Sequence, residues 1–253
     1  MIDDLALITH LADAAGAAIR PHFRTGFAVE TKSDASPVTV ADRAAEAAIR
    51  QLLAQHRPHD GVIGEEYGED RPDADRVWVL DPIDGTRAFA AGRPLFGTLI
   101  GLLVAGQPVL GVIDQCIIGD RGLAGPGHPT TLNGRPARTR TCATLAAARL
   151  GTTSPHAFPG TDFPAFEQLR VQVADTLYGG DCHNYGLAAS GHLDLVVEAG
   201  LKLHDWAALV PVVQGAGGVM TDWAGQPLQM GSDGRVIAAG DARMAAAAAT
   251  ALG

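Results

Sequence analysis

The sequence predicts an α+β protein. Apolar residues recur at helical spacing in residues 4–23 and 39–56, whereas residues 96–119 are strand-like throughout. Alanine and glycine are abundant and aromatic residues make up only 5% of the chain, which favours tight helix–sheet packing over a large aromatic core. The 253 residues, 47% of them hydrophobic, can build either one large α/β unit or two lobes of about 120 residues each.

The sequence indicates where the first helix ends and where the second begins. The amphipathic helix of residues 4–23 is expected to stop near Pro21. In the helix of residues 39–56, Thr39 is the expected N-cap and Asp42 occupies the capping-box position, after an entry turn at Ser36 and Pro37.

Strands are expected in the segments that follow. A short strand at Val62 and Ile63 ends in Gly64, and residues 76–81 form the next strand before a short helix within residues 85–94. Residues 96–119 are expected to form two antiparallel strands joined by a turn at residues 105–108.

Glycine and proline dominate residues 119–138, which include an Asn-Gly turn signal. We expect a boundary near residue 138, with an N-terminal α+β lobe at 1–138 carrying most metal ligands and a C-terminal α/β lobe at 139–253. In the second lobe the expected elements are a strand at 148–154, a helix near 163–176, a helix running into a strand at 178–200, a helix at 205–218, strands at 218–228 and 235–240, and a closing helix.

Charge and cysteine content limit the function classes. The formal charge is −9 and no basic run occurs, so a nucleic-acid backbone is not an expected partner. The acids can form metal sites, although a generally acidic surface accounts for most of the charge. The three cysteines share no metal-type spacing, which predicts buried thiols in a reducing compartment. An acidic N-terminus and no apolar run near 18 residues predict a cytoplasmic protein without a signal peptide or membrane span.

Two carboxylates follow the apolar strand of residues 76–81. Asp81 and Asp84 would raise each other's pKa unless a cation neutralised them, and around the turn at Pro82 they can converge on one point. The carbonyl of Ile83 offers a further oxygen, and oxygen-only ligation suits Mg²⁺.

Gly85 and Thr86 then begin a helix, whose free N–H groups can cradle a phosphate beside the metal. Taken alone, the pattern is equally compatible with Asp84 as a helix N-cap and Asp81 as a turn residue.

Further acids stand at other element ends. Glu65 can complete a metal shell and orient a water, whereas a solvated acidic loop is the favoured interpretation of Glu66, Glu69 and Asp70. Asp205 precedes an expected helix, as an ordinary N-cap or, if it lies beside Asp81, as a carboxylate shared between two metals. Two such ions would bind phosphate oxygens, lower the pKa of a bound water and stabilise the leaving alkoxide. Thr86 and Glu65 could position and deprotonate that water.

Together these residues resemble the inositol monophosphatase family of Mg²⁺-dependent phosphatases. The resemblance covers most of the chain and is carried by GEE at 64–66, LDPIDGT at 80–86, HDWAAL and GAGG within 204–218, and SPVTVAD at 36–42. It implies a layered α-β-α-β-α sandwich of the sugar phosphatase type, with both lobes contributing to one cleft, usually in a homodimer.

The resemblance also implies roles for individual residues. A first metal would be held by Glu65, Asp81 and the Ile83 carbonyl, and a second by Asp81, Asp84 and Asp205. Asp42 and Thr86 would support a third metal or the nucleophilic water, and the Gly85 and Thr86 amides would receive the phosphate. Two or three Mg²⁺ ions are therefore expected.

Within the family the chain most resembles the histidinol-phosphate phosphatase branch, over residues 86–103, 178–225 and 232–241. This implies that Asp84, Asp181 and Glu198 lie on the substrate side. Histidinol carries an ammonium and an imidazole, so Asp181 and Glu198 can pair with cationic nitrogen, whereas a neutral polyol needs only hydroxyl partners.

The expected reaction is hydrolysis of L-histidinol phosphate in histidine biosynthesis. The alternatives are an inositol-1-monophosphatase or broader small-molecule phosphatase and, in another class, a non-catalytic Mg²⁺-dependent regulatory or binding protein, which predicts damaged metal ligands. A nucleotide bisphosphate is disfavoured because no basic or aromatic cluster suits a purine and a second phosphate.

Three positions depart from the family pattern. His204 stands where the family usually has tryptophan, Gly215 where it usually has glutamate, and Gly122 where the branch often has an aromatic residue. A position behind the metal ligands or at the rim is favoured for His204 over substrate contact. His183 and Asn184 can line the pocket because they neighbour Asp181, or can lie outside it.

Overall fold

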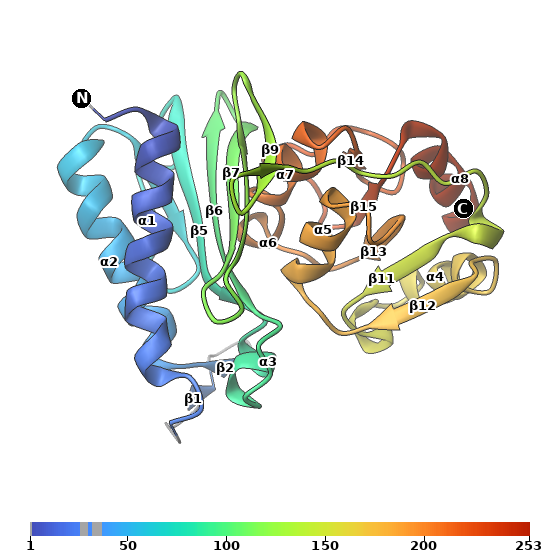
Figure 1. Ribbon diagram of the computed structural model, residues 1–253, viewed down its shortest axis with the longest axis horizontal. Helices are drawn as coiled ribbons and strands as arrows, with labels where there is room; N and C mark the ends of the chain where they lie inside the picture. The colour runs from blue at the N-terminus through green and yellow to red at the C-terminus, as the bar shows by residue number, and fades with distance from the viewer. Residues whose placement is uncertain (1, 26–29, 32–36) are drawn as a thin grey trace.

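The computed structural model describes residues 2–25, 30–31 and 37–253, which form five layers (Figure 1). Helices α1 (Asp4–Ile19) and α2 (Val40–His56) cover one face of an eight-stranded sheet. Helices α5 (Cys182–Ala189), α6 (Leu203–Trp206) and α7 (Leu209–Gly215) lie between this sheet and a five-stranded sheet. Helices α4 (Asp162–Arg170) and α8 (Ala242–Leu252) cover the outer face of the second sheet. The α-β-α-β-α sandwich that the resemblance implied is confirmed.

The first sheet has the strand order β10-β9-β8-β7-β6-β5-β3-β4, and all its neighbours are antiparallel except β3 and β5. Its strands are β3 (Gly61–Gly64), β4 (Gly68–Asp70), β5 (Arg76–Asp84), β6 (Gly97–Val104), β7 (Gln107–Gln115), β8 (Asp120–Gly125), β9 (His128–Leu132) and β10 (Arg135–Pro136). The expected antiparallel pair within residues 96–119 is confirmed as β6 and β7. A separate two-stranded ribbon joins β1 (Glu30–Thr31) to β2 (Pro37–Val38).

The glycine-rich segment 119–138 is not a connection without strands, because β8, β9 and β10 extend the first sheet through it. Gly119, Gly127 and Gly134, all with positive φ, lie in the turns that flank these strands. Asn133 and Gly134 have φ of 53° and 73°, the pair of positive angles that a tight Asn-Gly hairpin requires. The strands of the first sheet end at Pro136 and those of the second begin at Arg149. A division into lobes at residue 138 stays a prediction.

The second sheet has the order β12-β11-β13-β15-β14. Its strands are β11 (Arg149–Thr152), β12 (Asp175–Tyr178), β13 (Leu195–Glu198), β14 (Val219–Thr221) and β15 (Val236–Ala239). The helix expected near residues 163–176 ends at Arg170, and the end of that segment instead forms the parallel edge strand β12, paired with β11.

The single helix expected at residues 205–218 is two helices, α6 and α7, separated at Ala207 and Ala208. Pro211 has no N–H to donate to the Ala207 carbonyl, so a continuous helix would lose a hydrogen bond there. Asp205 therefore does not precede a helix as expected. It lies inside α6, where its Oδ2 accepts the Lys202 N–H at 2.6 Å.

The predicted start of α2 is confirmed. Thr39 is its N-cap and, with Asp42, forms a capping box. Helix α1 ends at Ile19, and a 3₁₀ turn at Arg20–His22 contains Pro21. Ser36 lies outside the described residues.

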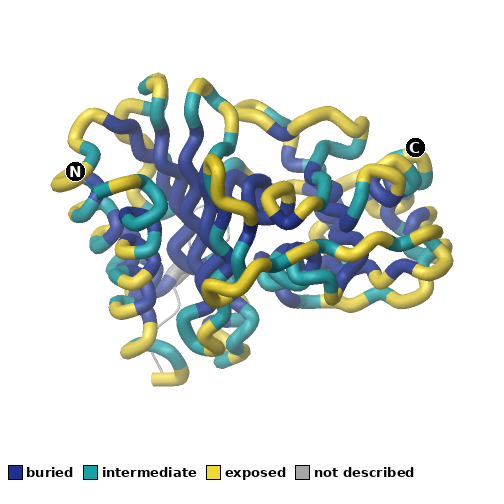
Figure 2. Tube along the Cα trace, turned by 45° about the horizontal axis from the view of Figure 1, so that its top comes forward, coloured by how far each residue is buried: buried dark blue, intermediate teal, exposed yellow. Residues whose placement is uncertain are grey.

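Apolar side chains fill each space between the layers, so burial is concentrated in the central strands (Figure 2). Trp78, on the face of β5 toward α1 and α2, has no exposed surface, and Trp206 is 1% exposed between the two sheets. The three cysteines are free thiols, but only Cys182 is fully buried. Among the described residues, no helix has the length and apolarity to cross a membrane.

Two paired glycines let the α6–α7 connection lie directly on the first sheet. Gly101 on β6 pairs with Gly111 on β7. A Cβ on Gly111 would lie 2.1 Å from the Ala208 carbonyl oxygen, and one on Gly101 would lie 3.0 Å from the Ala208 nitrogen. Only glycine permits this approach, which holds α6 and its Asp205 beside β5.

Replacing Gly111 with alanine should destabilise the protein by about 1–3 kcal/mol, because the new methyl group displaces backbone rather than a flexible side chain. Denaturant unfolding measures this loss. Gly122→Ala is the matched control in the same sheet, since its Cβ would lie 3.4 Å from Val212. Equal stability of the two variants would contradict the close-approach role.

Candidate active site

An irregularity in β5 brings the two aspartates of the LDPIDGT segment together. Asp81 pairs with Leu99 and Asp84 with Gly97, so three residue steps on β5 oppose two on β6. In a regular strand, residues three apart point to opposite faces, and the extra residue of the bulge reverses this. Their carboxylates therefore converge, so both can face one ion although they lie on the same strand.

Two overlapping groups of donors form around Asp81. Asp81, Asp84 and Asp205 have carboxylate oxygens that all lie within 4.8 Å of one another. Glu65, Asp81 and His204 form a second group by the same measure. Glu65, Asp81, Asp84 and Asp205, which come from three separate segments of the chain, therefore lie together in the structure.

The donor set fits divalent cations. Asp81 is only 2% exposed, and its Oδ1 is buried with no hydrogen-bond partner among the described residues. Burial and the charges of Glu65, Asp84 and Asp205 raise the pKa of Asp81 well above its usual value. Burial and the charges of Asp181 and Asp205 likewise raise the pKa of Asp84. Clustered buried carboxylates with an unsatisfied oxygen need either protons or cations.

A buried glutamate that sequence reasoning missed holds the turn that carries Glu65. Glu46 on α2 has no exposed surface and accepts the backbone N–H groups of Glu66 at 2.7 Å and Tyr67 at 3.2 Å. Arg50 donates to the same carboxylate at 2.7 Å. Gly64 is required beside it, because a Cβ there would lie 1.9 Å from Glu46 Oε1. The signal available was a glutamate one helical turn after Asp42.

Thr86 lies between two further oxygen atoms. Its hydroxyl is 3.1 Å from the Ile83 carbonyl and 3.5 Å from Asp42 Oδ1. Asp42 is fully buried, accepts the Thr39 N–H at 2.8 Å and has a pKa raised chiefly by burial. The two residues that the resemblance assigned to a third metal or the nucleophilic water therefore lie together, and the Ile83 carbonyl faces the same hydroxyl.

Gly85 begins α3 (Thr86–Ala90) in a left-handed conformation, with φ of 87°. Its open side faces Asp181, because a Cβ on Gly85 would lie 3.0 Å from the Asp181 carboxylate. Asp181 itself has φ of 46°, a strained conformation for a residue with a side chain. Burial raises its pKa to about 6, while Arg93 and Arg87 lower it and Asp205 raises it.

A cavity of about 230 Å³ adjoins these carboxylates and is lined by Asp84, Asp205, Asp181 and Glu198, among others. Glu198, 6% exposed, accepts the Thr153 N–H at 2.8 Å and the Tyr185 hydroxyl at 3.0 Å. Burial raises the pKa of Glu198 to about 7, although these two hydrogen bonds lower it. Tyr185 is a lining residue that the sequence analysis did not single out.

His183 and Asn184 do not line this cavity. His183 forms a hydrogen bond with the side chain of Gln115, and Asn184 donates to the Gly179 carbonyl at 3.1 Å. Cys182 and Tyr185 line it instead, because residues three apart share one face of helix α5. Adjacency in sequence to Asp181 therefore does not predict which residues of α5 line the cavity.

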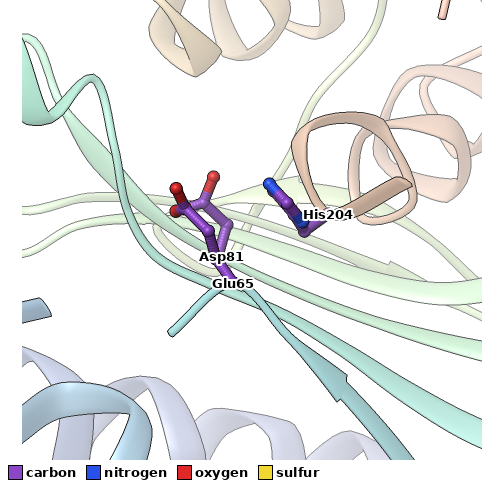
Figure 3. A group of neighbouring side chains, drawn as sticks. All are labelled: Glu65, Asp81 and His204. Carbon is purple, nitrogen blue, oxygen red and sulfur yellow. The ribbon is translucent and has the colours of Figure 1, made fainter. Parts of the chain in front are cut away.

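His204 points its imidazole into the space that the Glu65 and Asp81 carboxylates face (Figure 3). Its side chain is 12% exposed, and its Nε2 lies 3.6 Å from Asp205 Oδ1. It therefore belongs to the carboxylate cluster rather than to an outer rim.

Comparison with known proteins agrees with this geometry. The family model described as the inositol monophosphatase family matches residues 3–252. The chain belongs to the inositol monophosphatase family. It is a phosphatase of that family.

Individual members of the inositol monophosphatase family are similar to the chain over nearly its full length. "Bifunctional phosphatase IMPL2, chloroplastic" of Arabidopsis thaliana is 48% identical over 240 residues, covering 91% of this chain and 69% of that protein. A histidinol-phosphatase of Chlorobaculum parvum is 36% identical over 241 residues, covering 94% and 93%. The structure of an inositol monophosphatase from Zymomonas mobilis superposes with a TM-score of 0.92 at 52% identity, covering 99% and 97%.

Gly215, which departs from the family pattern, has a local reason in this member. A Cβ there would lie 2.6 Å from Thr130 Oγ1 and 3.0 Å from the Ala124 side chain. Helix α7 packs so closely on β8 and β9 that a glutamate would not fit.

Mg²⁺ should stabilise the protein more at pH 8 than at pH 5. The pKa values of Asp81 and Asp84 in the folded state are raised above 3.8, so the metal-free protein loses stability as pH rises from about 4 through those pKa values. A bound cation favours the ionised carboxylates and cancels that loss. At a 100-fold excess over Kd, we expect Tm at pH 8 to rise by roughly 5–10 °C.

Thermal unfolding with and without Mg²⁺ at both pH values measures this difference. Asp84→Asn should raise the metal-free Tm at pH 8 and remove most of the Mg²⁺ shift. A Mg²⁺ shift of equal size at both pH values would contradict the account.

Proposed function

We propose that the chain hydrolyses L-histidinol phosphate to L-histidinol and inorganic phosphate, as a Mg²⁺-dependent step of histidine biosynthesis. The proposal includes a homodimer in the cytoplasm and two or three ions per site. Curated relatives named histidinol-phosphatase, including that of Chlorobaculum parvum at 36% identity, support the substrate.

The cavity beside the carboxylates is the observation that carries the substrate assignment. At one end lie Asp84 and Asp205 of the metal cluster, and the remaining lining includes Asp181 and Glu198. Among the described residues, no lysine, arginine or histidine forms an ion pair with Glu198, which accepts hydrogen bonds from the neutral Thr153 amide and Tyr185 hydroxyl. A buried carboxylate held only by neutral donors is suited to a cationic ligand group.

The chain's own residues would divide the work as follows. Glu65, Asp81, the Ile83 carbonyl, Asp84 and Asp205 would hold the cations, which when bound supply neutralisation of the phosphate charge and acidification of water. Thr86 has one hydroxyl proton, directed to Ile83 or Asp42, so its lone pairs can accept a hydrogen bond from the attacking water and orient it. Glu65 would orient that water, and the Gly85 and Thr86 amides would bind the phosphate.

Inositol 1-phosphate is the second candidate substrate. It is favoured by the 52% identity to an inositol monophosphatase from Zymomonas mobilis. A neutral polyol would use the oxygens of Glu198 and Asp181 as hydrogen-bond acceptors only. A non-catalytic binding role has little support, because Asp81, Asp84 and Asp205 are all present and converge.

A phosphate-release panel with Mg²⁺ tests the proposal. Histidinol phosphate should give the highest kcat/KM, followed by inositol 1-phosphate, with fructose 1,6-bisphosphate and adenosine 3',5'-bisphosphate far below. Asp84→Asn, an isosteric change, should abolish release on every substrate without unfolding the protein. A higher kcat/KM for inositol 1-phosphate would replace the proposed substrate, and full turnover by Asp84→Asn would overturn the metal assignment.

Glu198→Gln should separate the two leading substrates. The amide keeps acceptor and donor atoms for Thr153 and Tyr185 but removes the charge, so kcat/KM for histidinol phosphate should fall about 10- to 100-fold. The value for inositol 1-phosphate should change little. Asp175→Asn, an exposed acid on β12, is the control. Equal losses on both substrates would show that Glu198 does not pair with a cation.

A further inference from the structure

The two donor groups around Asp81 differ in chemistry. Asp81, Asp84 and Asp205 offer oxygen alone, whereas Glu65, Asp81 and His204 include an imidazole nitrogen. Both groups share Asp81, whose Oδ1 is buried and has no hydrogen-bond partner among the described residues. The chain therefore presents two neighbouring cation positions that are not equivalent.

The arrangement of His204 suits ligation. Its side chain is 12% exposed, on a helix whose first turn is fixed by the 2.6 Å hydrogen bond from Lys202 N–H to Asp205. Its nearest ring nitrogen and the oxygens of Glu65 and Asp81 lie within 4.8 Å of one another. Ligands on opposite sides of a small divalent ion are about 4 Å apart, so small side-chain rotations bring all three onto one ion. Figure 3 shows all three side chains directed at the same space.

We propose that His204 is a metal ligand and makes the Glu65–Asp81–His204 position selective for Zn²⁺ over Mg²⁺. Imidazole nitrogen suits Zn²⁺, while oxygen-only donor sets suit Mg²⁺. The Asp81–Asp84–Asp205 position keeps the oxygen-only character that Mg²⁺ prefers. The inference rests on the metal centre of the proposed function and adds a difference in metal preference between its two positions.

Two substitutions test this without reference to turnover. His204→Phe keeps the ring shape and removes the ligand, and His204→Gln replaces the nitrogen with an amide oxygen. Zn²⁺ affinity, measured by competition with a chromophoric chelator, should fall at least about tenfold in both variants. Mg²⁺ affinity, measured calorimetrically, should change less than about threefold in His204→Gln. His192→Phe, at an exposed histidine whose side chain is hydrogen-bonded only to Ser190 among the described residues, should match the wild type.

Zn K-edge X-ray absorption on protein with one equivalent of Zn²⁺ gives a direct readout. Imidazole scattering should be present in the wild type and in His192→Phe, and reduced in both His204 variants. Absence of that signal in the wild type, or unchanged Zn²⁺ affinity in the variants, overturns the inference while leaving the proposed function intact. Tighter binding of both ions in the variants also overturns it, because that result identifies His204 as a repelling cation. Wild-type protein that binds neither ion overturns both proposals.

Discussion

Repulsion among buried carboxylates is the constraint on which the rest of this structure depends. Asp81 is 2% exposed, and its pKa and those of Asp84 and Asp205 are raised by burial and by neighbouring acids. Such a cluster persists only on rigid supports. The bulge in β5 turns Asp81 and Asp84 to one side, and the glycine pair at 101 and 111 seats the segment that carries Asp205. A bound cation would relieve the repulsion that folding creates.

Under the proposed function, the charges of Asp181 and Glu198 beside the cavity would select between substrates. Asp181 is strained and partly buried, and Arg93 and Arg87 lower its pKa, so its charge is partly compensated by the protein. Glu198 accepts hydrogen bonds from the neutral Thr153 amide and Tyr185 hydroxyl, so its negative charge is available to pair with a cationic ligand group. Under the proposed function the cavity would distinguish substrates by the charge of their organic part, while binding of the phosphate would depend on the metal cluster. Recognition and chemistry can vary independently, as expected for a family with several substrates.

Local signals predicted most of the site, and tertiary contacts decided the rest. The carboxylates at Asp81 and Asp84 were found because strand-end acids are costly without a cation, and Asp205 was assigned through the family resemblance of the HDWAAL motif. Glu46 was missed because its role depends on the contact between α2 and the turn after β3, which no local pattern reveals. The strands after residue 119 were missed because their glycines signal turns strongly and their short apolar runs signal strands weakly. The break between α6 and α7 was missed because it depends on Pro211, which has no N–H to donate to the Ala207 carbonyl.

Proton release on metal binding tests the central claim most directly. Metal-free protein at pH 6 is titrated with Mg²⁺ in two buffers of different ionisation enthalpy, and the difference in heat counts the protons displaced per ion. If cations replace protons on the clustered carboxylates, Mg²⁺ binding releases protons, and Asp84→Asn releases fewer. Mg²⁺ binding without proton release would show that the carboxylates are already ionised in the metal-free fold, and would contradict the account.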